Sequence, residues 1–344
     1  MEFLSEYGLF LAEALTVVVA ILVVAIGLMA LGQKGQRGAP GHIEVSKLNE
    51  RYGDFKDAMQ HALLNDKDFK KQRKAEKKRH KEEQKASRDQ DDARLRLYVL
   101  EFDGDIRASA TDNLREEISA VLGVARSGDE VLLKLESGGG LVHSYGLAAS
   151  QLQRIRDAGI QLTVAVDKVA ASGGYMMACV ANRVLAAPFA MIGSIGVLAQ
   201  IPNFHRLLRK ANVDFEQLTA GEYKRTLTMF GENTDADRAK MQEDLEDTHL
   251  LFKDFVAEHR EQVNIDSVAT GEVWFGQRAI DRGLVDELQT SDAYIQGCLA
   301  ERDVFEVKHV QNKQWQERLG MAAENALERS FLKLWQATIE KRLY

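Results

Sequence analysis

The chain has 344 residues, with 45 lysines and arginines against 52 aspartates and glutamates, and a formal net charge of −7. Its two cysteines, Cys179 and Cys298, form no CxxC motif, and its eight histidines show no metal-ligand spacing. This pattern argues against a disulfide framework and a structural metal. The phosphate-binding motif GxxxxGK[ST] does not occur, so the sequence does not indicate an ATP-driven enzyme, and we expect no cofactor.

The N-terminal segment contains a nearly continuous apolar run. Residues 14–32 carry no charge, and a helix of about 20 such residues crosses the hydrocarbon core of a bilayer. A cleaved signal peptide is the alternative, but it needs a basic start and a shorter apolar stretch. Three glutamates and no lysine or arginine precede the run. We therefore expect a retained transmembrane anchor over residues 1–33.

Residues 34–95 read as a charged linker or helical extension. A short stretch with glycines and a proline leads into a segment dominated by charged side chains, including a basic block at 70–81. A solvated charged helix or a disordered tether is the preferred interpretation, with contact to anionic lipid as the alternative. Nucleic-acid binding is not expected, because the basic block lacks interleaved aromatic residues.

Residues 96–302 alternate between apolar strand patterns and helical patterns. This alternation predicts a layered α/β domain. Glycine turns at the ends of strands are similar to those of the crotonase-like (Clp-protease-like) spiral fold. We expect strands at 97–102, 130–135, 161–166 and 183–187, and helices at 110–125, 144–157, directly after 172, at 203–211 and at 235–260.

The last segment, residues 303–344, changes character again. From residue 312 onward it shows the pattern of a charged amphipathic helix with tryptophans among its apolar positions. A partner helix or a self-association surface is the preferred interpretation, and a membrane-interface helix is the alternative.

Four short motifs within the α/β domain carry the chemistry. A serine hydroxyl is a poor nucleophile until a neighbouring base takes its proton. A lysine amine can be that base where burial favours its neutral form, and N–H groups of glycine-rich turns can hold the developing oxyanion. Together the four motifs predict a serine peptidase with a lysine base. In chain order they are Glu-Ser-Gly-Gly-Gly at 136–140, Ala-Ala-Ser-Gly-Gly at 170–174, Ile-Gly-Ser-Ile-Gly at 192–196 and Gly-Glu-Tyr-Lys at 221–224.

This ordered set resembles the signal peptide peptidase A family of membrane serine peptidases, and within it the SohB-type branch. The likeness runs from about residue 97 to 288 and includes the segments 100–106, 270–274 and 283–287. The resemblance implies a nucleophile at Ser172, a general base at Lys224, a lysine-positioning hydroxyl at Ser194, and oxyanion N–H donors at Gly139 and Gly173.

One position departs from the family pattern. The family usually has Ser-Pro-Gly-Gly at the oxyanion turn, whereas Gly138 occupies the proline position here. A glycine loosens the turn, which leaves open whether Gly139 or Gly140 provides the N–H group.

The resemblance also implies partners and a location. It implies apolar peptide substrates, such as released signal peptides or membrane-protein fragments, and a homo-oligomeric ring in which neighbouring protomers share the Ser/Lys dyad. It implies a single-pass protein of the bacterial inner membrane, acting on the outer face. The basic residues that follow the anchor would instead place the domain in the cytoplasm, so the side stays open.

Three other functions remain as alternatives. A Ser–His–Asp peptidase could use His143 or His205 as its base. A crotonase-like acyl-CoA enzyme would share the fold and the paired glycine turns but needs no nucleophilic serine. A non-catalytic membrane scaffold would use the glycine turns for packing alone. Cys179 is expected to be a packed small side chain and not a nucleophile.

Overall fold

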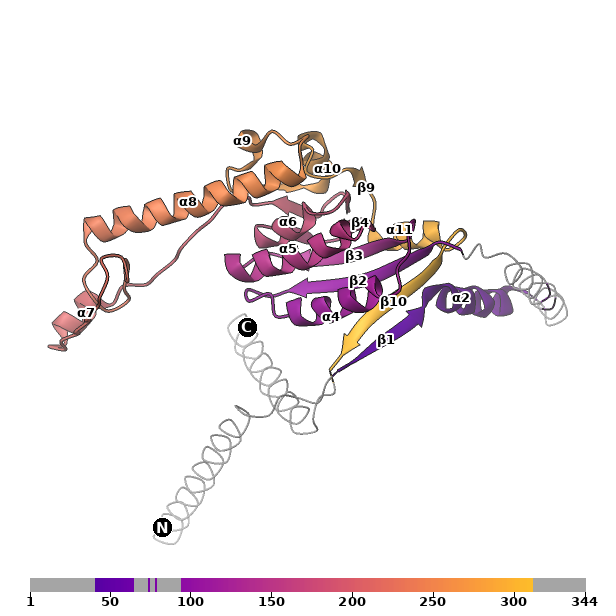
Figure 1. The fold of residues 1–344 in the computed structure, drawn as a ribbon, viewed down its shortest axis with the longest axis horizontal. Coiled ribbons are helices and arrows are strands. Elements are labelled where there is room, and N and C mark those ends of the chain that lie inside the picture. Colours follow the sequence, from indigo (N-terminus) through magenta and orange to yellow (C-terminus); the bar gives the residue numbers. More distant parts are fainter. Residues whose placement is uncertain (1–40, 65–73, 75–77, 79–93, 312–344) are drawn as a thin grey trace, which may run out of the picture. The chain divides into compact units, whose positions relative to one another are not determined.

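The computed structural model describes residues 41–64, 74, 78 and 94–311. Residues 43–309 form one compact unit (Figure 1), and the second unit, 1–42 with 310–344, contributes four described residues, 41–42 and 310–311. The expected anchor, most of the charged linker and the tail from 312 lie outside the described residues. Across the described ranges, no helix is both long and apolar enough to span a membrane.

The predicted α/β architecture is confirmed. Short segments rich in valine, leucine and alanine form the strands, because their side chains suit a buried pleated surface. The 10-stranded sheet consists of β1 (His42–Lys47), β2 (Arg96–Gly104), β3 (Glu130–Ser137), β4 (Gln161–Val166), β5 (Val169–Ala171), β6 (Arg183–Ala186), β7 (Met191–Gly193), β8 (Val273–Phe275), β9 (Glu287–Leu288) and β10 (Asp303–Val310).

Helices connect most of the strands, because parallel strands need a crossover connection, which is usually a helix. The longest, α8, starts with a capping box in which Thr234 and Asp237 satisfy each other's backbone N–H groups. The helices are α2 (Leu48–Leu63), α4 (Thr111–Leu122), α5 (Val142–Asp157), α6 (Gly173–Ala178), α7 (His205–Lys210), α8 (Asp235–His259), α9 (Ile265–Val268), α10 (Gly276–Ala279) and α11 (Ser291–Cys298), with a 3₁₀ turn at Ile280–Arg282.

The sheet branches at β3, and this branch positions the site. The main path runs β1-β10-β2-β3-β4-β6-β9, while β5, β7 and β8 form a side path. The first part of β3 pairs in parallel with β4, and its last residue, Ser137, pairs with Ala170 of β5. The other edge of β5 pairs in parallel with β7, where Ala171 lies opposite Gly193. The carboxyl ends of β3, β5 and β7 therefore meet at one place.

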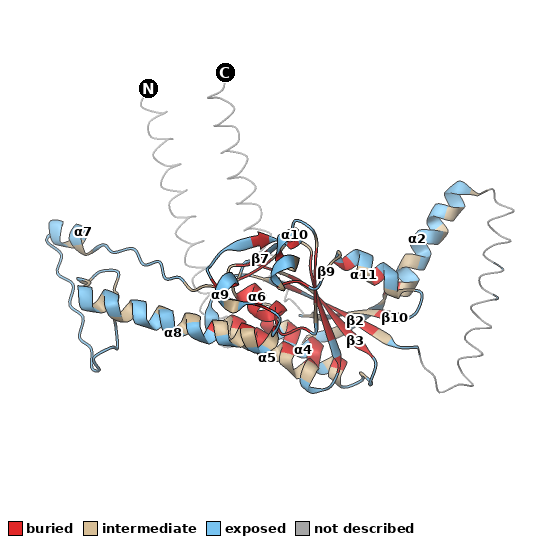
Figure 2. Ribbon diagram, turned by 90° about the horizontal axis from the view of Figure 1, so that it is seen from above, coloured by how far each residue is buried: buried red, intermediate tan, exposed pale blue. Residues whose placement is uncertain are grey.

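The two faces of the sheet bury separate apolar clusters. Along β3, Val131 and Leu133 point to one face and Leu132 to the other, and all three are fully buried. Helices α4, α5, α6 and part of α8 cover the first face, and α2 and α11 cover the second. Figure 2 shows the buried residues concentrated in the central strands and in α6.

The sheet extends beyond the expected domain limits of 96–302 on both sides. Strand β10 lies between β1 and β2, so residues on either side of those limits contribute strands. Asn49 of α2 fixes this arrangement: its amide donates to the carbonyls of Leu299 and Arg302 and accepts the N–H of Val304. Both strands carry charged residues at exposed positions, and this hid their apolar alternation in the sequence.

The C-terminal end of α8 is fixed to the sheet by a buried ion pair. The guanidinium of Arg260, the residue after the helix, is 3% exposed and donates two hydrogen bonds to the carboxylate of Asp286, at 2.8 and 2.9 Å. It also donates to the carbonyl of Gly283, and Asp286 accepts the N–H of Val184 in β6. This end of α8 is therefore held firmly against the domain.

Asp286→Asn should lower the free energy of unfolding by about 3 kcal/mol, because removing one partner leaves the buried guanidinium uncompensated. This is the low end of the usual range, since the Asp286 side chain is 31% exposed. Urea unfolding followed by circular dichroism measures the change, with the exposed Asp281→Asn as the matched control. Equal stability of the two variants would show that the ion pair does not hold the helix end.

Candidate active site

Ser172 lies at a sharp turn between β5 and α6. Its φ of +53° and ψ of −119° lie in a region that non-glycine residues rarely adopt, so the surrounding structure must hold this conformation. Two hydrogen bonds do so: the Ser172 N–H donates to the carbonyl of Gly193 at 2.8 Å, and its own carbonyl accepts the N–H of Met176 at 2.9 Å. The turn presents the serine side chain at the start of a helix.

Gly173 is the first residue of α6, so its N–H has no partner within the helix. The partial positive charge of a helix N-terminus adds to the field that this N–H provides. A side chain at Gly173 would overlap the ring of Tyr145, so only glycine fits here. The structure therefore leaves one backbone donor directly beside the Ser172 side chain.

The second glycine turn abuts the first. Gly139 has a φ of +87°, and a Cβ at this position would lie 2.8 Å from both the Gly173 nitrogen and the Ser172 Cβ. The Gly139 N–H donates to the hydroxyl of Ser137 at 3.1 Å. The N–H of Gly140 has no hydrogen-bond partner in the part of the chain that the structure describes.

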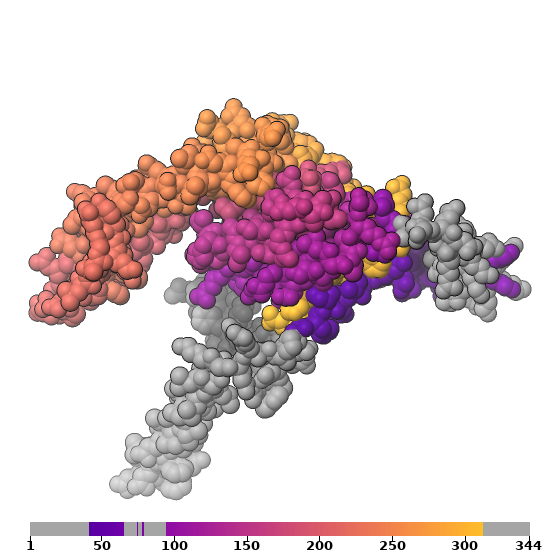
Figure 3. Space-filling model, viewed as in Figure 1, coloured from indigo at the N-terminus to yellow at the C-terminus, as the bar shows by residue number. Residues whose placement is uncertain are grey.

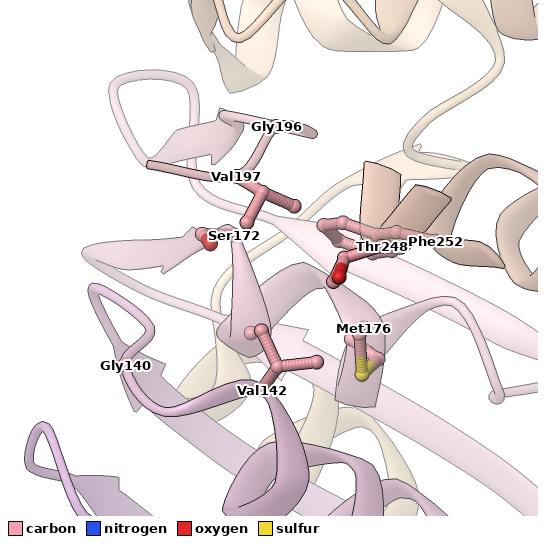
Figure 4. Close-up of a pocket in the computed structure, with 9 residues that line it drawn as sticks. Gly140, Val142, Ser172, Met176, Gly196, Val197, Thr248 and Phe252 are labelled. Carbon is pink, nitrogen blue, oxygen red and sulfur yellow. The ribbon is translucent and has the colours of Figure 1, made fainter. Parts of the chain in front are cut away.

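A small pocket opens at Ser172. Gly140 and Val142 line it on one side, and α6, the loop after β7 and α8 complete the wall (Figure 4). The side chains around the hydroxyl are mostly apolar, which suits an uncharged ligand group. The lining residues are Gly140, Val142, Ser172, Gly173, Met176, Gly196, Val197, Thr248 and Phe252.

Ser194 lies near Ser172 because each follows one of two paired parallel strands, β7 and β5. Ser194 also has a positive φ, +52°, and its N–H donates to the carbonyl of Glu272 at 2.6 Å. Two of the expected site serines are thus brought together, and both are held in strained backbone conformations.

Lys224 is not brought to Ser172 within one chain. It is exposed in a turn whose Tyr223 ring lies 5.2 Å from the ammonium of Lys240, near the start of α8. The pocket residue Thr248 lies eight positions later in the same helix, about 12 Å along its axis. In the space-filling view, the region of α7 and the first half of α8 stands clear of the helices that cover the sheet (Figure 3).

Comparison with known sequences identifies the family. The profile of the N-terminal region of peptidase family S49 matches residues 2–152, and the profile of peptidase family S49 matches residues 154–304. The chain belongs to peptidase family S49. It is 49% identical over 333 residues to the probable protease SohB of Haemophilus influenzae, covering 94% of each chain.

Further relatives support the same assignment. The S49 chain is 52% identical over 240 residues to the probable protease SohB of Buchnera aphidicola from Acyrthosiphon pisum, covering 70% of this chain and 71% of that one. The expected SohB-type branch and the expected class, a serine peptidase, are confirmed.

Among solved structures, a mutant of the membrane-bound stomatin-specific protease 1510-N in complex with a substrate peptide is similar. The match covers 66% of this S49 chain and 96% of the solved chain, with 13% identity. Its TM-score of 0.40 is too low to support a statement about the site.

Several residues at the candidate site could not be predicted from the sequence. Ser137 belongs to the glycine-rich motif at 136–140, but the sequence does not show that its hydroxyl accepts a hydrogen bond from the Gly139 N–H. Thr248 and Phe252 reach the pocket from a helix more than 70 positions after Ser172, and a lone buried tyrosine such as Tyr145 gives no local signal. Cys179 is confirmed as fully buried, and burial raises its pKa, so it is not a reactive thiolate.

Gly139→Ala should lower kcat by about 100-fold, because its Cβ would push the two glycine turns apart and misplace the N–H groups that the sequence predicts as oxyanion donors. Gly138→Ala is the matched control: a Cβ there meets no atom within 4 Å, and its φ is not positive. Steady-state hydrolysis of an apolar peptide measures both variants. Similar rates for the two would show that the close approach of the turns is not needed for catalysis.

Proposed function

We propose that this protein is a membrane-anchored serine endopeptidase in which Ser172 is the nucleophile and Lys224 the general base. The single observation that carries the proposal is the strained turn of Ser172, which places its side chain beside an unpaired helix N-terminus and a second glycine turn. Membership of a peptidase family supports it over the acyl-CoA enzyme and the non-catalytic scaffold.

The chemistry follows from this arrangement. The lysine amine takes the proton of the Ser172 hydroxyl as Oγ attacks the peptide carbonyl carbon. The carbonyl oxygen becomes an oxyanion that accepts hydrogen bonds from the Gly173 and Gly140 N–H groups. The lysine then protonates the leaving amine, and a water molecule releases the acyl group by the reverse sequence. We assign the second donor to Gly140 because the Gly139 N–H already donates to Ser137.

The base comes from a second copy of the chain in this proposal. Lys224 does not line the pocket, and the turn that carries it contacts Lys240, which precedes the pocket residue Thr248 by eight positions, or about 12 Å, along α8. A lysine acts as a base only where water is excluded, and Lys224 is exposed within one chain. The region around α7 and α8 also exposes large apolar side chains that a neighbouring chain would cover. They include Leu198, Leu207, Val213, Phe215, Leu218 and Leu251. Repetition of this contact gives a homo-oligomeric ring with one dyad at each boundary.

Ser194 orients the incoming lysine in this proposal. It follows the strand next to that of Ser172, so its hydroxyl can accept a hydrogen bond from an amine that approaches the nucleophile. This role matches the strained backbone of Ser194, which fixes the direction of its side chain.

The substrates are apolar peptide segments, such as released signal peptides or fragments of membrane proteins. The wall of the pocket is made largely by Val142, Met176, Val197 and Phe252, which favour an uncharged side chain of modest size. An anchor over residues 14–32 would keep the enzyme at the bacterial inner membrane, where such peptides collect. The branched sheet and its strand–turn–helix units are consistent with a crotonase-like spiral fold.

A histidine base is the second candidate. His143 follows the pocket residue Val142 in α5, which places it near the site. It has no hydrogen bond to a carboxylate among the described residues, and a catalytic histidine normally has one to fix its tautomer. This arrangement favours lysine.

Ser172→Ala and Lys224→Ala should each abolish hydrolysis of an apolar peptide panel, by about 1,000-fold or more, with little change in thermal stability. Lys224→Arg should be equally inactive, because arginine stays protonated at accessible pH. His143→Ala should retain most of the activity. Loss of activity in His143→Ala together with an active Lys224→Ala would replace the lysine with a histidine base.

A further inference from the structure

Beneath the two glycine turns lies a continuous chain of hydrogen bonds. The Tyr145 hydroxyl, from the first turn of α5, donates to the carbonyl of Asp105 at 2.7 Å and lies 2.5 Å from the hydroxyl of Ser137. The Ser137 oxygen in turn accepts the Gly139 N–H at 3.1 Å. The residue that follows β2, the last residue of β3 and a residue of α5 are thereby joined.

The hydroxyl protons in this chain of hydrogen bonds can point in only one direction. A hydroxyl has one proton, and that of Tyr145 goes to the Asp105 carbonyl, which has none to give. The Ser137 proton therefore points to the Tyr145 oxygen, because its other acceptor, the Gly104 carbonyl, is 3.4 Å away. This leaves the lone pairs of Ser137 for the Gly139 N–H. Hydrogen bonds aligned in this way polarise and strengthen one another.

Burial makes this arrangement rigid. Tyr145 is fully buried and Ser137 is 2% exposed. Burial raises the pKa of Tyr145, so its hydroxyl stays protonated. Gly104 leaves room for the pair, because a Cβ there would lie 2.6 Å from both hydroxyl oxygens.

The same tyrosine supports both glycine turns. Its ring fills the space beneath Gly173, where any side chain would overlap it, and its hydroxyl acts through Ser137 on Gly139. The chain also decides which N–H of the second turn is free. Because the Gly139 N–H is held by Ser137, the Gly140 N–H remains for a ligand in the pocket.

We propose that Ser137 and Tyr145 are positioning residues that set the geometry of the oxyanion hole. They hold the Gly139 peptide so that the Gly140 N–H faces the reacting carbonyl together with the Gly173 N–H. The inference rests on the proposed function, since it assumes an oxyanion beside Ser172.

Tyr145→Phe tests the proposal, because it removes the hydroxyl and keeps the ring beneath Gly173. We expect kcat to fall about 10-fold or more with KM unchanged, since a misplaced donor weakens binding of the transition state and not of the substrate. Affinity for a peptide aldehyde, whose adduct with Ser172 carries an oxygen at the oxyanion position, should fall in parallel. Affinity for the cleaved product peptide should not change.

Tyr175→Phe is the matched control. Tyr175 is equally buried, and its hydroxyl also donates to a backbone carbonyl, that of Leu284, at 3.0 Å. This variant should lose comparable stability and keep its kcat. Equal kcat values in Tyr145→Phe and Tyr175→Phe would overturn the proposal and leave Tyr145 with a packing role alone.

Ser137→Ala provides a second test within the same chain of bonds. Its kcat should fall at least as far as that of Tyr145→Phe, and the double variant should be little worse than Ser137→Ala, because both changes break one connected unit. Multiplicative losses in the double variant would show that the residues act independently and would contradict the proposal.

The outcome separates this inference from the proposed function. If Ser172→Ala remains active, Ser172 is not the nucleophile, no oxyanion forms beside it, and the proposed positioning role fails together with the proposed function. If Ser172→Ala is inactive while Tyr145→Phe and Ser137→Ala keep the wild-type kcat, the peptidase mechanism stands and the positioning role fails.

Discussion

The candidate site depends on the pairing of one three-residue strand. Strand β5 pairs with the last residue of β3 on one edge and with β7 on the other. Ser172 follows β5, the glycine turn follows β3 and Ser194 follows β7, so three segments far apart in the sequence end at the same place. The hydrogen bond from Ser172 to the Gly193 carbonyl then fixes the strained turn. A shift in this pairing would separate Ser172 from the two glycine turns to which the proposed mechanism assigns the oxyanion donors.

Much of this could be predicted from the sequence, and the reasons differ by element. The strand at 161–166 was predictable because it is a short, nearly continuous apolar run, and the helix predicted at 144–157, observed at 142–157, was predictable because its apolar residues have helical spacing. Strands β1 and β10 were not, because charged residues at exposed positions mask their pattern. Ser172 and the glycine turns were predictable from motif order, whereas Tyr145, Thr248 and Phe252 reach the site only through tertiary packing.

The long helix α8 links two parts of the proposed active unit. Its C-terminal half is fixed by Arg260 and contributes Thr248 and Phe252 to the pocket. Its N-terminal half lies beside the turn that carries Lys224. One chain therefore contributes Ser172 to the pocket while Lys224 does not line it, which is the arrangement expected under the proposal that neighbouring chains complete each other's sites.

The most direct test of this account is complementation between two inactive variants. Ser172→Ala and Lys224→Ala chains are produced in the same cell, purified together through two different tags, and assayed on an apolar peptide. The account predicts that activity returns to a substantial fraction of the wild-type value, because some boundaries combine an intact Ser172 with an intact Lys224 from the neighbour. Co-purified mixed oligomers with no more activity than either variant alone would contradict a dyad shared between chains.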